Sequence, residues 1–127
     1  MGAIERFEDL VAWQRARVLT ARIYELTRTP IFASDRGLSS QLQRASVSII
    51  SNIAEGYERG SLKEYHQYLV MAKASCAEVR SQLYVALDAG YLNHANFDEM
   101  MQLTVETSKI IGGLRASIAR KLDNKSQ

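Results

Sequence analysis

Small polar and charged side chains recur at helical spacing along one segment in the middle of the chain. Arg44, Ser48 and Asn52 follow one another at intervals of four, and Glu55 lies three residues further on. Acid–base catalysis requires titratable groups within hydrogen-bond reach of each other. Arg44 and Glu55 are eleven residues apart, about 16 Å along a helix, so they cannot act as a pair unaided. These groups either bond neighbouring helices or subunits and fix their register, or contact a ligand or nucleic acid.

The residue types that bind metals or act as nucleophiles are few. His66 and His94 are the two histidines, and neither has a second His or a Cys three or four residues away, as a metal site would require. Cys76 lies on an apolar stripe, which favours packing over nucleophilic chemistry. No glycine-rich phosphate loop is present. We therefore expect no catalytic residue, no metal and no cofactor, and an enzyme is the least supported class.

The elements that must position these residues are helices. The chain has one proline, and its β-branched residues never alternate with the period of two that half-buried strands require. Apolar residues instead recur every three or four positions. We predict an all-α, up-down-up-down four-helix bundle in a single domain, residues 1–127, with helices at about 9–29, 35–59, 61–89 and 97–122 and a short polar C-terminal tail.

Helix ends are marked by residues that satisfy unpaired backbone groups. Ser34 or Asp35 can cap the second helix, and Ser61 opens a capping box for the third. Gly90 lies where a left-handed C-terminal cap would end that helix. Asn96, with a glutamate three residues on, is the predicted cap of the fourth helix.

The second predicted helix carries more apolar residues than one core face can use. A second stripe adjoins its core stripe, and the two together cover an arc of roughly 200°, against about 100° for an ordinary surface helix. The second stripe consists of Val47, Ile50, Ala54 and Tyr57. Either this helix is deeply buried within the monomer, or the second stripe is a subunit interface, which we predict.

Basic residues gather in the first and the fourth predicted helix. An up-down-up-down bundle places the start of the first beside the end of the fourth, so we expect their charges to form one patch. The candidate phosphate contacts are Arg15, Arg17, Arg22, Arg115, Arg120 and Lys121. Repeated in an oligomer, such a patch would bind anions multivalently. A solvated face or a contact with an acidic protein partner are the alternatives.

Composition limits the class of protein further. The chain has 127 residues, is 46% hydrophobic and carries a formal charge of +2, which suits one folded domain and excludes disorder and collagen-like structure. The charge alone does not mark an obligate nucleic-acid binder. No apolar run approaches the ~20 residues that cross a bilayer, and the first residues do not resemble a signal peptide. We expect a soluble, cytoplasmic protein that contacts no membrane.

The segment from Arg44 to Gly56, RASVSIISNIAEG, resembles the signature of a known family. These are the four-helix bundle proteins first noticed as open reading frames in intervening sequences of bacterial 23S rRNA genes. The similarity covers nearly the whole chain, from residues 7–10 to residues 89–92. Two positions depart from the pattern: many relatives have Pro or Ala at Ile50 and Gly at Ala74.

The resemblance implies a left-handed four-helix bundle that assembles as a ring-shaped homopentamer. It also marks five positions as family signature residues: Arg44, Ser48, Asn52, Glu55 and Gly56. A related branch, the accessory variability determinant proteins of diversity-generating retroelements, forms similar basic pentamers that bind nucleic acid and a reverse transcriptase. Members outside those elements have no settled function.

The sequence therefore leads to two hypotheses about function. In the first, a non-enzymatic pentameric accessory protein binds RNA or DNA non-specifically through its basic residues. In the second, a structural ring docks a partner protein, such as a reverse transcriptase, and has no nucleic-acid role. The sequence does not decide between them.

Overall fold

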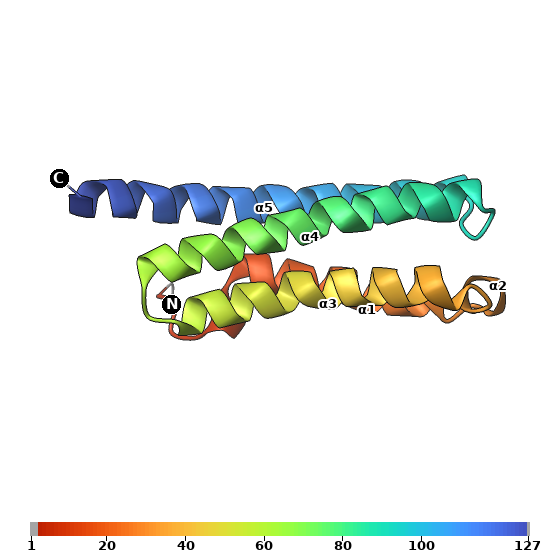
Figure 1. Ribbon diagram of the computed structural model, residues 1–127, viewed down its shortest axis with the longest axis horizontal. Helices are drawn as coiled ribbons and strands as arrows, with labels where there is room; N and C mark the ends of the chain where they lie inside the picture. The colour runs from red at the N-terminus through yellow and green to blue at the C-terminus, as the bar shows by residue number, and fades with distance from the viewer. Residues whose placement is uncertain (1–2, 127) are drawn as a thin grey trace.

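The computed structural model describes residues 3–126, which fold into helices without a strand. Within this range the long helices are α1 (Val11–Thr27), α3 (Arg36–Glu58), α4 (Leu62–Asp88) and α5 (His94–Ser126). Two short helices, η1 (Phe7–Asp9) and α2 (Pro30–Ala33), precede and follow α1 (Figure 1). None of the described helices is both long and apolar enough to cross a membrane.

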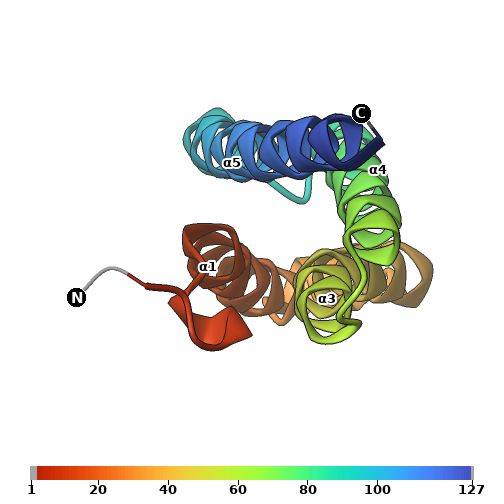
Figure 2. The same cartoon turned by 90° about the vertical axis from the view of Figure 1, so that its left-hand side faces the viewer.

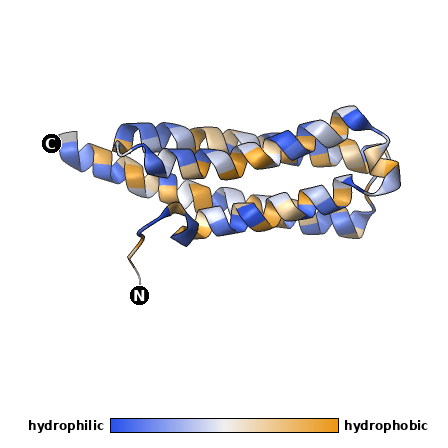
Figure 3. Cartoon of the chain, turned by 90° about the horizontal axis from the view of Figure 1, so that it is seen from below, coloured by the Kyte–Doolittle hydropathy of each residue, from blue (hydrophilic) through white to orange (hydrophobic). Residues whose placement is uncertain are grey.

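The four long helices lie lengthwise against one another, and each runs opposite to the one before it (Figure 1). In this arrangement α3 packs on α1 and α4, and α5 packs on α4 and α1. Hydrophobic and hydrophilic residues alternate along the helices (Figure 3), and the apolar faces meet inside. The side chains of Leu19, Ile49, Leu83 and Ile111, one from each long helix, are completely or almost completely buried in this core.

The predicted caps of α3 and α4 are present. An oxygen of the Asp35 carboxylate accepts a hydrogen bond from the Leu38 N–H at 3.0 Å, and the Ser61 hydroxyl accepts one from the Glu64 N–H at 3.3 Å. Gly90 follows the end of α4 with a φ of +83°, a left-handed conformation that glycine adopts without strain.

Two predicted helices have different bounds in the structure. The first, predicted over 9–29, is shorter and spans Val11–Thr27, because the extended Leu10 separates η1 from α1; the extended Thr29 separates α2, beyond the predicted helix. The fourth begins at His94, not at residue 97, because the Asn93 side chain caps it by accepting the Asn96 N–H at 2.7 Å. Asn96 is therefore not the cap. The helix also continues to Ser126 through the predicted tail, since no Gly or Pro follows Gly113 to end it.

Candidate nucleic-acid interface

Two signature residues of α3, Ser48 and Gly56, lie against α4, and a third, Asn52, bonds to Ser48 within α3. The hydroxyl oxygens of Ser48 and Ser75 are 2.8 Å apart, and the Asn52 amide donates to the Ser48 carbonyl at 2.8 Å. Gly56 is buried, and a Cβ added there would lie 2.7 Å from the Cβ of Tyr68. The small residues Ser48 and Gly56 let the two helices approach closely.

The two charged signature residues, Arg44 and Glu55, are exposed and are not brought together. Because α3 is continuous from Arg36 to Glu58, they remain about 16 Å apart along its axis. Arg44 lines a groove of about 290 Å³ between α3 and α4. The residues lining this groove are Gln41, Arg44, Ala45, Ser48, Glu78 and Gln82. The arrangement offers hydrogen-bonding groups but no acid–base pair formed by Arg44 and Glu55.

The second apolar stripe of α3 is covered in part by the chain itself. Ile50 and Tyr57 are half-buried and pack against the core, and Ala54 is also half-buried. Phe7 and Trp13 line a shallow hollow together with Ile50 and Ala54, so the N-terminal segment covers this part of the stripe. Val47 is the member that remains exposed, at 39%. The subunit interface stays a prediction, and of the four residues Val47 is now the one most available for it.

The basic residues of α1 have partners within the chain. An Arg15 nitrogen lies 3.2 Å from a Glu106 oxygen, and Arg22 forms ion pairs with Glu25 and Glu99. The hydrogen bond that Arg22 donates to the Glu99 carboxylate raises the pKa of its guanidinium above its ordinary value. Pairing with carboxylates reduces the positive charge that these two arginines present to a phosphate.

Arg17 is exposed, and its guanidinium lies over the Trp13 ring, 5.7 Å from the ring centre. Trp13 itself is half-buried. Arg17 thus lies beside an aromatic surface at the start of α1, apart from the acidic residues that pair with Arg15 and Arg22.

Arg115 and the middle of α5 lie against α4. An Arg115 nitrogen is 3.2 Å from the Nε2 of His66, and the Lys73 ammonium donates to the Ser108 carbonyl at 3.3 Å. Figure 2 shows the C-terminal turns of α5 over α4 and away from the start of α1. We call this region the basic end, and it comprises Lys63, Arg115, Arg120, Lys121 and Lys125.

The six predicted cations therefore lie in two places, and the expectation that they share one patch is wrong. The cause is a difference in length: α1 has 17 residues and α5 has 33, about 25 Å and 50 Å at 1.5 Å per residue. α5 thus passes beyond the start of α1. Whether any of these cations contacts nucleic acid remains a prediction.

The candidate phosphate contacts chosen from the sequence did not include Lys63 and Lys125. The signal was available, because an antiparallel order also places the start of the third long helix beside the end of the fourth. Arg120, Lys121, Lys63 and Lys125 are all exposed. The acidic residues of the same turns are Asp123 and Glu64, and Glu64 lies 3.7 Å from Arg59.

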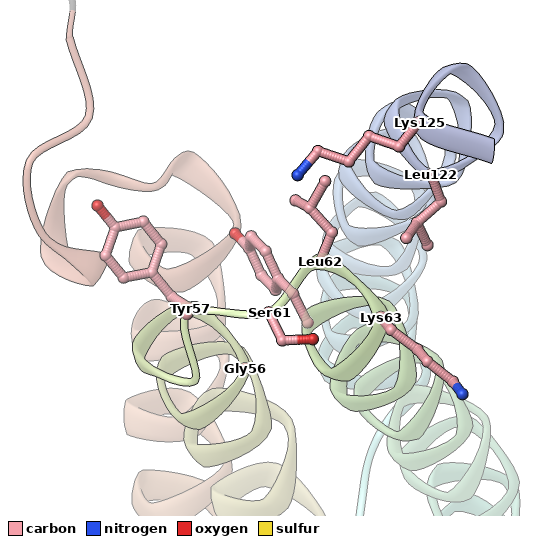
Figure 4. A pocket seen from close by; sticks show the side chains of 9 residues that line it. Gly56, Tyr57, Ser61, Leu62, Lys63, Leu122 and Lys125 are labelled. Carbon is pink, nitrogen blue, oxygen red and sulfur yellow. The ribbon is translucent and has the colours of Figure 1, made fainter. Parts of the chain in front are cut away.

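A pocket of about 520 Å³ opens at the basic end, where the end of α3, the start of α4 and the end of α5 meet (Figure 4). Its lining comprises Gly56, Tyr57, Gly60, Ser61, Leu62, Lys63, Tyr65, Leu122 and Lys125. The Tyr57 and Tyr65 rings meet edge to face, with centres 6.1 Å apart. Burial, with a smaller effect of Tyr57, raises the pKa of Tyr65 to about 12, so its hydroxyl stays protonated at neutral pH.

The side chains considered for metal binding and nucleophilic chemistry lie apart. Among the residues that the structure describes, no three of the His, Cys, Asp and Glu side chains are grouped as metal ligands would be. Cys76 is fully buried, and this burial raises the pKa of its thiol to about 11, so the thiolate is scarce at neutral pH.

The structure and its basic end define an all-α protein of four long antiparallel helices with a charged surface at one end. The family described as 23S rRNA-intervening sequence protein matches residues 8–113, and the chain belongs to this family. The family resemblance inferred from the signature segment is thereby confirmed.

A solved structure supports the same fold. The crystal structure of a protein of unknown function from the S23 ribosomal protein family, from Bacteroides thetaiotaomicron, matches with a TM-score of 0.75. The match covers 83% of this chain and 98% of that chain, at 18% sequence identity, so it bears on the fold alone. No curated protein sequence is similar enough to this chain to match it.

Proposed function

We propose that this chain is a non-enzymatic accessory protein of the bacterial cytoplasm that binds RNA or DNA without reading its sequence. The observation that carries the proposal is the basic end, where Lys63, Arg120, Lys121 and Lys125 are exposed. Lysine and arginine side chains bind phosphates and release the counterions condensed on nucleic acid, which supplies sequence-independent affinity.

The arginines of α1 have a smaller part in this function. Arg15 and Arg22 already pair with glutamates of α5, so a phosphate would have to compete with a carboxylate for each of them. Arg17 lacks such a competitor near its guanidinium in the contacts described above, and it is retained as a phosphate contact. The phosphate-binding residues are therefore Arg17, Arg115, Arg120 and Lys121 of the predicted six, together with Lys63 and Lys125.

The proposal includes assembly as a left-handed four-helix bundle in a homopentameric ring. A ring requires a heterologous contact, in which two different patches of the protomer meet. Val47 is exposed beside the contact between α3 and α1, where Thr20 donates to the Ser46 carbonyl. Val11 and Val18 are 57% and 48% exposed on the other side of α1. These two apolar patches support a heterologous contact.

A ring would strengthen binding to nucleic acid without any new contact. Each protomer adds one basic end, and linked sites bind a polyanion far more tightly than a single site does. A net charge of +2 per chain, too small to predict nucleic-acid binding on its own, becomes +10 in five copies.

A second candidate function is the docking of a partner protein, and one observation favours it. The outer face of α4 carries four exposed apolar side chains, which are Val70, Met71, Tyr84 and Val85. Exposed apolar residues grouped on one helix are typical of protein-interaction surfaces. In this alternative the ring binds a polymerase-like partner, such as a reverse transcriptase, and the basic end contacts no nucleic acid.

Fluorescence anisotropy with labelled single- and double-stranded DNA and RNA of random sequence tests the first function. At ~50 mM salt we expect binding that weakens steeply as salt rises to ~200 mM. Absence of binding at ~50 mM salt would remove nucleic acid as a ligand. A pull-down from cell extract that retains a polymerase after nuclease treatment would then favour the second function.

A further inference from the structure

The pocket at the basic end combines aromatic, apolar and cationic groups in one place. Tyr57 and Tyr65 contribute rings, and Leu62 and Leu122 contribute aliphatic side chains (Figure 4). Its volume of about 520 Å³ lies within the range of small-molecule sites, ~300 to 1,000 Å³. This lining suits a flat, largely apolar group, since aromatic rings offer stacking faces and edges.

The lysines of the pocket favour a ligand with a negative charge. Lys63 and Lys125 belong to its lining, both are exposed, and they come from different helices, α4 and α5. The lining residues contain no carboxylate side chain to balance them. A ligand that carries a negative charge beside a flat apolar group therefore matches the pocket in charge as well as in shape.

The position of the pocket indicates which anion reaches it. Lys63 and Lys125 belong both to the pocket and to the basic end, so a phosphate chain held along the basic end passes the mouth of the pocket. A nucleotide has the required combination of a flat base and an adjacent phosphate. Only unpaired nucleotides can turn their bases into a protein pocket without first breaking a duplex.

We propose that this pocket holds an unpaired base of single-stranded nucleic acid, which stacks on Tyr57 while its phosphate is bound by Lys125, whose ammonium points toward the tyrosines (Figure 4). The inference rests on the proposed function and narrows it from nucleic acid in general to single strands. Tyr57 was predicted from the sequence to be part of a subunit interface. The proposal assigns it to the pocket instead, and Val47 remains as the interface residue.

Anisotropy with a labelled oligothymidylate of 20 nucleotides and a duplex of equal length tests the proposal. The wild-type protein should bind the single strand at least about tenfold more tightly. Tyr57→Leu retains an apolar side chain against the core but removes the stacking ring, so it should weaken single-strand binding by roughly 5- to 100-fold and leave duplex binding unchanged. Tyr84→Leu is the control that should bind like the wild type, because it removes an exposed tyrosine elsewhere on α4, outside the pocket.

A second measurement guards against a Tyr57 variant that fails to fold. Adenosine monophosphate, titrated into the wild-type protein and followed by nuclear magnetic resonance, should cause saturable shifts at the pocket residues. Lys125→Ala changes an exposed side chain and should weaken this binding several-fold.

The outcomes separate the two proposals. Equal affinity for single strand and duplex, together with no effect of Tyr57→Leu, would overturn the base pocket and leave the proposed function standing. The absence of saturable shifts with adenosine monophosphate would likewise overturn the pocket. Failure of both strands to bind at ~50 mM salt would overturn both proposals.

Discussion

Gly56 lies at a close contact between α3 and α4. A Cβ at this position would lie 2.7 Å from the Tyr68 Cβ and 3.1 Å from the Tyr65 Cδ1, and a Cβ atom cannot move without its backbone. We therefore expect Gly56→Ala to lower the free energy of unfolding by about 1–3 kcal/mol, as overpacked cores do. Chemical denaturation followed by circular dichroism measures this change.

Gly113 provides the matched control for Gly56. It lies within α5, and a Cβ added there would meet nothing within 4 Å. Gly113→Ala should raise the free energy of unfolding by about 0.5–1 kcal/mol, because alanine loses less backbone freedom in a helix. Changes of the same sign at both glycines would contradict the packing described for α3 and α4.

Because of Cys76, we expect the free energy of unfolding to fall as the pH becomes alkaline. Burial raises the pKa of the thiol from 9.0 to about 11, so the folded chain keeps a proton that the unfolded chain releases at lower pH. The contribution of the protonated thiol to the free energy of unfolding is complete below pH 9 and is lost as the pH rises towards 11. For a shift of two pKa units, the loss amounts to at most about 2.7 kcal/mol.

Denaturation curves recorded from pH 7 to pH 10 test this dependence. Cys76→Ala removes the titrating group and should show a smaller loss of stability between pH 9 and pH 10 than the wild type. Its stability at pH 7 should be lower by roughly 1 kcal/mol because of the lost side-chain volume. Parallel curves for the two proteins over this range would show that the thiol is not the cause.

At the scale of an element, the residue that caps the start of α5 differs between the sequence prediction and the structure. The Asn93 side chain accepts the Asn96 N–H, so Asn93→Ala should lower the free energy of unfolding by about 1 kcal/mol. Asn96→Ala should change it by less than about 0.5 kcal/mol. Thermal unfolding of the two variants side by side measures both effects, and the reverse order would restore Asn96 as the cap.

The helices were predictable because each carries a regular apolar stripe and clear end signals. Asp35 and Ser61 cap the helices that the sequence assigned to them. Asn93 and Asn96 are three residues apart and equally suitable as caps by type, so only the packed position of the helix start decides between them. Leu10 could not be predicted as extended, because it fits the apolar period of α1 and its backbone conformation depends on the packing of η1.

At the scale of the whole molecule, assembly should depend on Val47 more than on Ile50. Ile50 packs partly on the core of its own chain, so a charge there would disturb the protomer as well as a contact between subunits. Val47→Asp changes a side chain that is 39% exposed and should dissociate the ring into folded protomers. Light scattering should give about 72 kDa for the wild type, five times 14.3 kDa, and 14.3 kDa for the variant.

Met71→Asp serves as the control for assembly, because Met71 is similarly exposed but lies on α4. It should leave the mass at five subunits. A wild-type mass of 14.3 kDa would refute oligomerisation, and a dimer would refute the ring.

The candidate site was predictable in its residue types but not in its arrangement. The excess of basic residues at the end of α5 is plain in the sequence. Which residues lie next to these cations depends on how far α5 extends past α1 and on which helix the end of α5 crosses. Both depend on tertiary packing, which the sequence pattern does not show. The pairing of Arg15 and Arg22 with Glu106 and Glu99 likewise joins residues that are far apart in the sequence.

The salt dependence of nucleic-acid binding, compared between two double variants, tests the central claim that the basic end of α4 and α5 holds the phosphates. Arg120→Gln with Lys121→Gln removes two exposed cations of the basic end, and Arg15→Gln with Arg22→Gln removes two that pair with glutamates. The first variant should bind far more weakly than the wild type, with a salt slope smaller by about two per bound protomer, and the second should stay close to the wild type. An equal or larger loss in the second variant, or an unchanged slope in the first, would contradict the account.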